Sequence, residues 1–313
     1  MNWQQTAFLF PGQGSQTVGM SKALADAYPV VKETFEQAND ILGYDLAKLC
    51  FEGPAEQLNE TIHTQPALFV SGAAAFRALN DNLTALPAFA AGHSLGEFTA
   101  LFAAGALTFE DGLRLVQKRA SLMRDAGEKS PGAVAALLGL EIDAVRLLCQ
   151  DAQQVTGEVV VLANDNCPGQ VVISGSHAAL DKAVEFANER GAKKAVKLAV
   201  SVAVHSPLMK EAGEEFGMVV EQTPFHAPRF PVVANVTAQP LTDVAALRQE
   251  LSVQIISPVR WTESIQTMLA AGVNSFIELG PGGVLKGLLK RIDRGAAGIS
   301  VETPEDLEKL IAL

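Results

Sequence analysis

Segments that favour strands alternate with segments that favour helices along most of this chain of 313 residues. Apolar runs at 6–10, 88–92 and 275–279 each lead into a glycine-containing turn and then into a segment of helical composition. Such alternation is typical of parallel sheets, because parallel neighbours are joined by a crossover that is usually a helix. We therefore predict an α/β architecture with a parallel-sheet core, and the chain length favours a second, smaller unit.

The larger unit should contain the parallel sheet and the helices that cover it. Strands are expected at 6–10, 88–92, 232–235 and 275–279. Helices are expected at 17–42, 66–81, 94–104, 108–126 and 284–291, with a last short helix after the N-cap pair Thr303-Pro304.

Residues 132–200 follow a different order of elements. Strands are expected at 132–140, 159–163, 170–174 and 195–200, and helices at 143–154 and 178–190. The order βαββαβ is that of a ferredoxin-like unit. We predict a small ferredoxin-like domain at 128–198, inserted between residues 1–127 and 199–313 of a large catalytic domain.

Charge and apolar content argue against several classes of protein. A net charge of −11 disfavours a nucleic-acid binder, because neutralising phosphates needs a basic face. The apolar stretch 98–107 is too short to span a membrane, and no signal peptide is evident. Cys50, Cys149 and Cys167 lack metal-ligand spacing, so free buried thiols in a cytoplasmic protein are expected.

The stretch 9–21 joins the first strand to the first helix through a glycine loop of the kind that often binds phosphates. Thr17 stands where the dinucleotide pattern G-x-G-x-x-G needs its third glycine. Gly14 and Gly19 have the Walker spacing, but Met20 stands where a lysine must reach the phosphates. Nucleotide binding is therefore not expected of this loop.

The pentapeptide Gly92-His-Ser-Leu-Gly96 fits G-x-S-x-G, the pattern of a nucleophile elbow. Small flanking residues allow a strand to turn sharply into a helix, which exposes the serine hydroxyl and points the Leu95 N–H at a developing oxyanion. The expected strand before it and helix after it match an α/β-hydrolase-like domain. We interpret Ser94 as a nucleophile, with a structural turn serine as the alternative.

A serine nucleophile needs a base, and the chain has five histidines. His205 precedes Ser206-Pro207, an N-cap serine with proline at the first helical position. The positive end of that helix would disfavour the imidazolium and keep the ring available as a base, although a structural strand-end histidine is the alternative. Of the other four, His93 adjoins the serine but points elsewhere, and His177 lies at a helix start. His63 and His226 lie in loop-like segments.

Arg119 falls among the apolar residues of the helix expected at 108–126, between Leu115 and Met123. A guanidinium on a core-facing side is costly unless it is paired. Either a structural carboxylate pairs with Arg119, or the side chain binds an anionic ligand bidentately.

Together these motifs resemble the malonyl-CoA:acyl carrier protein transacylases of fatty-acid synthesis and the related acyltransferase domains of polyketide synthases. The resemblance spans nearly the whole chain in the same order. Its motifs are Phe10-Pro-Gly-Gln-Gly-Ser-Gln16, Thr64-Gln-Pro-Ala67, Gly92-His-Ser-Leu-Gly-Glu97, Gln117-Lys-Arg119, Asn166-Cys-Pro-Gly-Gln-Val-Val-Ile-Ser-Gly175, His205-Ser-Pro-Leu-Met209, Gln254, Pro258-Val-Arg-Trp261 and Glu278-Leu-Gly-Pro-Gly282.

The resemblance implies a ping-pong acyl transfer in which Ser94 is acylated and His205 is its base. It implies that a backbone carbonyl near Gln254 orients the histidine and that Arg119 binds the malonyl carboxylate. Backbone N–H groups of Gln13 and Leu95 would form the oxyanion hole. Two further residues are expected to contact the substrate, Asn166 and Val204; the valine leaves the choice between malonyl and methylmalonyl open.

The implied partners are malonyl-CoA and holo acyl carrier protein, with no further cofactor or metal, and the enzyme is expected to be a monomer. An acidic carrier protein needs a local basic patch on this acidic enzyme. The first candidate patch is Arg190, Lys193, Lys194 and Lys197, and the second is Lys286, Lys290 and Arg291.

Two rival functions would make different demands on Ser94, His205 and Arg119. A serine hydrolase or editing thioesterase would discharge acyl groups to water, but it would gain nothing from a buried Arg119. A nonenzymatic carrier-protein-binding module would not need both Ser94 and His205. A stand-alone polyketide acyltransferase with another extender unit is a third possibility that the motifs leave open.

Overall fold

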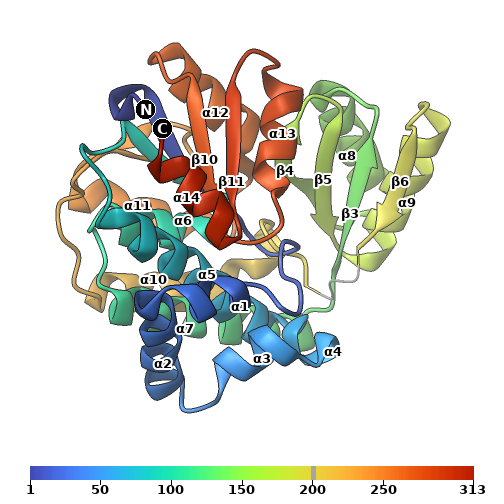
Figure 1. Cartoon of the computed structure of the whole chain (residues 1–313). Coiled ribbons are helices and arrows are strands. Elements are labelled where there is room, and N and C mark those ends of the chain that lie inside the picture. Colours follow the sequence, from blue (N-terminus) through green and yellow to red (C-terminus); the bar gives the residue numbers. More distant parts are fainter. Residues whose placement is uncertain (199–201) are drawn as a thin grey trace.

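The computed structural model describes residues 1–198 and 202–313, which form a larger and a smaller sheet (Figure 1). The strand order of the larger sheet is β11-β10-β1-β2-β7-β8. These strands are β1 (Thr6–Phe10), β2 (Phe89–Gly92), β7 (Val232–Val233), β8 (Pro240–Leu241), β10 (Ser275–Leu279) and β11 (Ala297–Val301). All of the pairings are parallel except that of β7 with β8, so the predicted parallel-sheet core is confirmed.

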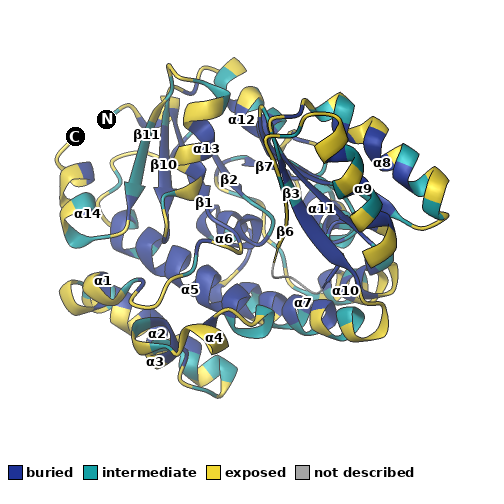
Figure 2. Cartoon of the chain, turned by 90° about the vertical axis from the view of Figure 1, so that its right-hand side faces the viewer, coloured by how far each residue is buried: buried dark blue, intermediate teal, exposed yellow. Residues whose placement is uncertain are grey.

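Helices cover both faces of the larger sheet, so β1 is buried along its whole length. Phe8 and Phe10 pack toward α5 (Thr61–Asn80) and α6 (Gly96–Ala103), whereas Ala7 and Leu9 pack toward α12 (Trp261–Ala270) and α13 (Val284–Ile292). Figure 2 shows α5 as a buried helix beneath the sheet. This burial explains why β1 is apolar throughout rather than alternating with polar residues.

The smaller sheet has the strand order β6-β3-β5-β4-β9. Its strands are β3 (Ala133–Leu138), β4 (Val160–Cys167), β5 (Gln170–Gly175), β6 (Lys194–Lys197) and β9 (Val259–Arg260). Two helices, α8 (Ile142–Thr156) and α9 (His177–Glu189), pack on one face of it. The unit β3-α8-β4-β5-α9-β6 has the antiparallel order of a ferredoxin-like fold, as predicted.

The two sheets are joined by β9, which lies in sequence between β8 and β10 of the larger sheet but pairs in parallel with β4 of the smaller sheet. Helices α12 and α13 also contact β4 as well as the larger sheet (Figure 1). The division of the chain at 128 and 198 therefore stays a prediction. Residues 199–201 lie outside the described residues. They include residue 199, at which the second part of the large domain is predicted to begin, and the end of the strand expected at 195–200.

The remaining elements surround these layers. They are η1 (Trp3–Gln5), α1 (Lys22–Ala27), α2 (Pro29–Leu42), α3 (Leu46–Glu52), α4 (Ala55–Leu58), α7 (Phe109–Lys129), η2 (Pro207–Met209), α10 (Lys210–Gln222), α11 (Val244–Gln254) and α14 (Pro304–Ile311). The expected N-cap of the last helix is confirmed: Thr303 caps α14 in a full capping box, with Pro304 at its first position.

Two helix predictions were wrong in their limits. The helix expected at 17–42 begins only at Lys22 and is broken where Tyr28 is extended, because Pro29 lacks the N–H that a continuous helix needs. The helix expected at 66–81 begins at Thr61, with Pro66 inside it. His63 therefore lies in α5 and not in a loop.

Among the described residues, no helix combines the length and the apolar character that crossing a membrane requires. The three cysteines are buried and free, as predicted.

Candidate active site

Ser94 lies in the turn between β2 and α6 with a φ of 51°, a left-handed conformation that is uncommon for a residue with a side chain. The turn is tight on both sides of the serine. A Cβ at Gly92 would lie 1.9 Å from the Gly96 carbonyl carbon, and a Cβ at Gly96 would lie 2.0 Å from the Phe10 carbonyl oxygen. Glycine is therefore required at both flanking positions, which is why the pattern could be recognised from the sequence.

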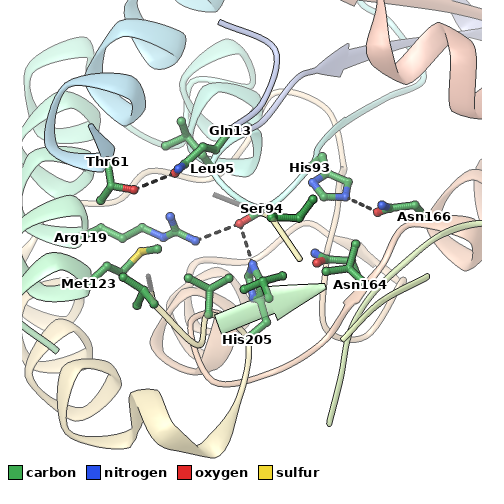
Figure 3. A pocket seen from close by; sticks show the side chains of 15 residues that line it. Gln13, Thr61, His93, Ser94, Leu95, Arg119, Met123, Asn164, Asn166 and His205 are labelled. Atoms are coloured by element: carbon green, nitrogen blue, oxygen red, sulfur yellow. Dashed lines mark hydrogen bonds between the residues drawn. The ribbon is translucent and has the colours of Figure 1, made fainter. Parts of the chain in front are cut away.

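The imidazole of His205 lies beside the serine (Figure 3). The Ser94 hydroxyl is 2.8 Å from His205 Nε2. His205 Nδ1 lies 3.0 Å from the carbonyl oxygens of both Gln254 and Ser257, so Nδ1 must carry the hydrogen. This leaves Nε2 as the acceptor for the serine hydroxyl, which is the arrangement that a general base needs.

His205 also has a left-handed backbone, with a φ of 56°, and its N–H donates to the Ile255 carbonyl oxygen. The ring is buried, and this burial together with the nearby Arg119 guanidinium lowers the pKa of His205 to about 3. The imidazole is therefore neutral at physiological pH. The expected serine cap is present, because Ser206 Oγ accepts from the Leu208 N–H at the start of η2.

Arg119 extends from α7 into the same pocket, where it is 2% exposed. Its Nη2 donates to Ser94 Oγ at 3.0 Å (Figure 3). Nη2 also donates to Gln254 Oε1 at 3.0 Å, and Nη1 donates to Gln65 Oε1 at 2.7 Å. The buried Nε has no hydrogen-bond partner in the described part of the chain. Burial lowers the pKa of Arg119 to about 10, so the guanidinium keeps its charge at neutral pH.

No carboxylate forms an ion pair with Arg119 among residues 1–198 and 202–313. Of the two readings that the sequence left open, a directly paired structural carboxylate is therefore absent from the described residues. A buried cation with an unsatisfied N–H is suited to an anionic group of a ligand.

The Gln13 and Leu95 side of the pocket faces Ser94 (Figure 3). Gln13 follows β1, and its side-chain oxygen accepts from Thr61 Oγ1 at 3.0 Å. In the described part of the chain neither backbone N–H, that of Gln13 or of Leu95, has a hydrogen-bond partner. Both are available to a developing oxyanion.

The pocket has a volume of about 210 Å³ and lies between the larger unit and the face of the smaller sheet that α8 and α9 leave uncovered. Val204 lines it, as expected, and so does Asn166, whose Oδ1 lies 2.8 Å from His93 Nε2. The further apolar lining consists of Met123, Val134, Val172, Leu198 and Val202. No three metal-ligating side chains gather anywhere in the described residues.

The first candidate basic patch lies along β6 at the edge of the smaller sheet. Arg190 pairs with Asp151 and Lys197 with Asp181. The stem of Lys193 lies against Gly139, and Lys194 is exposed. In the second candidate patch Arg291 donates to the Pro168 and Gln170 oxygens, so it links α13 to the β4–β5 turn.

Three polar residues of the site were not predicted from the sequence. Gln65 holds Arg119, Asn235 holds the backbone on either side of His93, and buried Glu97 accepts hydrogen bonds from Asn235 and Gln254. Gln65 and Glu97 lie within motifs of the resemblance, which was the only signal for them. Asn235 lay at the end of an expected strand, with no local pattern to mark it.

The chain is similar to known proteins over nearly its whole length. The model of the acyl transferase domain family matches residues 7–303. A malonyl CoA-acyl carrier protein transacylase of Haemophilus influenzae is 47% identical over 296 residues, covering 94% of this chain and 94% of that protein.

Solved structures agree with the sequence match. An acyl carrier protein S-malonyltransferase of Vibrio cholerae is 44% identical, with a TM-score of 0.94 over 98% of this chain and 99% of that chain. A solved complex of a type II polyketide synthase acyl-carrier protein with its malonyl-transacylase includes a chain that is 41% identical, with a TM-score of 0.95 over 98% and 99% of the two chains. These structures share the α/β-hydrolase-like fold with its ferredoxin-like part, and the chain belongs to the acyl transferase domain family.

Proposed function

We propose that this enzyme transfers a malonyl group from malonyl-CoA to the pantetheine thiol of holo acyl carrier protein through a malonyl-Ser94 intermediate. The observation that carries the proposal is the buried Arg119 guanidinium, whose Nη2 lies 3.0 Å from the Ser94 hydroxyl. A malonyl carboxylate bound there would bring the thioester carbonyl of the same short acyl group to the serine. A neutral acyl group would leave the guanidinium without an anion.

In the first half-reaction His205 Nε2 accepts the Ser94 proton as Oγ attacks the thioester carbon. The negative charge on the carbonyl oxygen is stabilised by the N–H groups of Gln13 and Leu95. The intermediate collapses, the carbon–sulfur bond breaks, and His205 returns the proton to the sulfur of departing CoA. The malonyl group stays on Ser94 as an ester, held through its free carboxylate by Arg119.

The second half-reaction runs the same steps with the other thiol. The pantetheine thiol gives its proton to His205 and attacks the ester carbon, and the same two N–H groups stabilise the oxyanion. Ser94 Oγ then leaves and recovers the proton from His205. The reacting groups all come from one chain, from the malonyl-CoA thioester and from the pantetheine thiol, so we propose a monomer that uses no further cofactor or metal.

Mass spectrometry of the intact enzyme tests this function. Malonyl-CoA should add one malonyl group per chain, and Ser94→Ala should abolish the label. Adding holo acyl carrier protein should remove the label faster than water does. Loss to water at the same rate as to the carrier protein would instead support the hydrolase.

We also propose that the carrier protein docks along β6. This strand lies at the edge of the smaller sheet, and the residue after it, Leu198, lines the pocket. Lys193 and Lys194 are the exposed cations of this patch for which no ion pair is found among the described residues. The pantetheine arm of an acidic carrier protein docked there would reach Ser94 along the pocket wall.

Charge reversal tests the docking surface. The double variant Lys193→Glu, Lys194→Glu should lower kcat/KM for holo acyl carrier protein about tenfold at low salt, with a smaller effect at high salt, because rim charges act on association. Acylation of Ser94 by malonyl-CoA should be unchanged. Lys286→Glu with Lys290→Glu on α13 is the comparison arm, and a larger effect there would move the docking surface to α13.

A further inference from the structure

Glu97 is a buried carboxyl group in the first turn of α6 that the proposed reaction does not use. Its Oε1 accepts a hydrogen bond from the Asn235 backbone N–H at 3.0 Å, and its Oε2 accepts one from Gln254 Nε2. A buried carboxyl group is costly to keep unless its oxygens are satisfied, so both bonds are needed. Each of them leads to a different part of the active site.

The first connection leads to the nucleophile. Asn235 Oδ1 accepts from the Ser94 N–H at 2.7 Å, and Asn235 Nδ2 donates to the Gly92 carbonyl oxygen at 2.7 Å. The asparagine therefore bridges the backbone on both sides of His93, where the chain turns from β2 into the left-handed Ser94. Such a conformation persists only when its surroundings fix it. Glu97 in turn fixes the backbone of Asn235.

The second connection leads to the guanidinium. Gln254 Nε2 donates both to Glu97 and, at 3.0 Å, to the Ser94 carbonyl oxygen. Its Oε1 accepts from Arg119 Nη2 at 3.0 Å. The amide of Gln254 thus lies between a carboxyl group and a cation. Its NH2 group faces Glu97 and its oxygen faces Arg119.

A second acid lies next to this network. Glu250 accepts from the Val236 N–H at 2.7 Å, so the two carboxyl groups hold neighbouring peptide groups. Burial, and secondarily the nearby Glu250, raises the pKa of Glu97 well above its usual range, and burial raises that of Glu250 to about 7. A negative charge on one of these carboxyl groups therefore disfavours ionisation of the other. The hydrogen bonds from Asn235, Val236 and Gln254 need only a carboxyl oxygen as acceptor.

We propose that Glu97 is a positioning residue that holds Ser94 through Asn235 and Arg119 through Gln254, so that one carboxyl group sets both the nucleophile and the acyl selectivity. The inference rests on the proposed function for its malonyl readout. It predicts that the two connections can be cut separately. Cutting the Asn235 connection should affect every acyl group, whereas cutting the Gln254 connection should affect malonyl in particular.

Glu97→Gln should cut the Gln254 connection. The Asn235 N–H is a fixed backbone donor, so the new amide must turn its oxygen toward it and its NH2 toward Gln254. Two NH2 groups then face each other, and the Gln254 amide must turn over and present a donor to Arg119. We expect malonyl loading of Ser94 to fall about tenfold or more while acetyl loading falls less, so the malonyl-to-acetyl ratio drops.

Asn235→Ala should cut the other connection, lowering malonyl and acetyl loading by the same factor and leaving the ratio unchanged. Glu278→Gln is the matched control, because Glu278 is an equally buried glutamate that accepts from the Leu285 and Lys286 N–H groups at α13. In the described part of the chain its side chain has no bond to the residues of this site. The malonyl-to-acetyl loading ratio of Glu278→Gln should equal that of the wild type even if the thermal stability of this variant falls. Thermal unfolding of all three variants identifies losses due to misfolding.

A neutral fluorophosphonate supplies a readout that does not depend on malonyl-CoA. Asn235→Ala should slow the phosphonylation of Ser94 about tenfold. Glu97→Gln leaves the Asn235 bridge in place and loses only the Gln254 bond to the Ser94 carbonyl oxygen, so it should slow this reaction less than Asn235→Ala does. A wild-type malonyl-to-acetyl ratio in folded Glu97→Gln, or equal losses of both acyl groups, would overturn the proposal. Failure of the wild-type enzyme to load malonyl would overturn the proposed function instead, and the fluorophosphonate rates would still decide the role of Asn235.

Discussion

Arg119→Ala should reduce malonyl loading of Ser94 by roughly 10²–10³-fold while leaving acetyl loading within a few-fold of the wild type. The guanidinium is buried, charged and without an ion pair among the described residues, so its removal deprives the malonyl carboxylate of its cation at a buried position in the pocket. Hydrogen bonds to a charged group contribute about 1.5–3 kcal/mol each, and a bidentate pair more. Acetyl has no carboxylate to lose. The measurement is the ratio of the two acylation rates, read by intact mass.

The matched control for this variant is Arg114→Ala. Arg114 is the same residue type on the same helix, but it is exposed on the opposite face, where it pairs with Glu110. It should leave both acylation rates unchanged. Equal losses of malonyl and acetyl loading in Arg119→Ala would show that Arg119 supports the fold or the Ser94 hydroxyl rather than the acyl carboxylate.

The sequence was sufficient where local sterics decide the structure. The Ser94 turn needs a residue without a Cβ at Gly92 and Gly96, and this need leaves a readable pattern. The apolar strands β1 and β10 were likewise predicted at their observed limits, because burial on both faces makes them continuous apolar runs. The ferredoxin-like order followed from the alternation of such runs with helical segments.

Predictions failed where tertiary packing overrides a local signal. Pro66 favours a helix start by itself, but α5 is buried along most of its length and continues through the proline. Strands β8 and β9 have two residues each, which is too short for any periodicity to appear. The joining of the two sheets by β9 therefore could not be predicted.

The supporting residues of the site were hidden for a different reason. Asn235 lies 141 positions from Ser94 along the chain, and Gln254 lies 157 positions from Glu97. Their roles depend on contacts that form only when β7 and α11 reach the carboxyl end of β2. The left-handed backbone of His205 is equally non-local, since its N–H is held by Ile255. Chemistry-bearing residue types can be read from a sequence, whereas the hydrogen bonds that orient them cannot.

His205→Ala should slow the acylation of Ser94 by about 10²–10⁴-fold, the usual contribution of a general base. The wild-type rate should respond unusually to pH. An imidazole with an ordinary pKa of 6.5 would be only about one-tenth neutral at pH 5.5, and the rate would fall about tenfold there. Because burial and Arg119 lower the pKa of His205 to about 3, the imidazole stays neutral, and single-turnover acylation should lose less than about twofold between pH 7.5 and 5.5.

The lowered pKa of His205 also predicts how the free energy of unfolding depends on pH, independently of catalysis. The unfolded chain binds a proton at His205 below pH 6.5, whereas the folded chain does not until the pH approaches 3. The contribution of the neutral buried ring is therefore fully present above pH 6.5 and is lost progressively as the pH falls from 6.5 toward 3. His205→Ala removes this linkage, so its free energy of unfolding, measured by urea titration, should fall less steeply with acidification than that of the wild type. Parallel pH profiles for the two proteins, together with a tenfold loss of wild-type acylation at pH 5.5, would show that the imidazole titrates as an ordinary exposed histidine and is not held neutral by its burial.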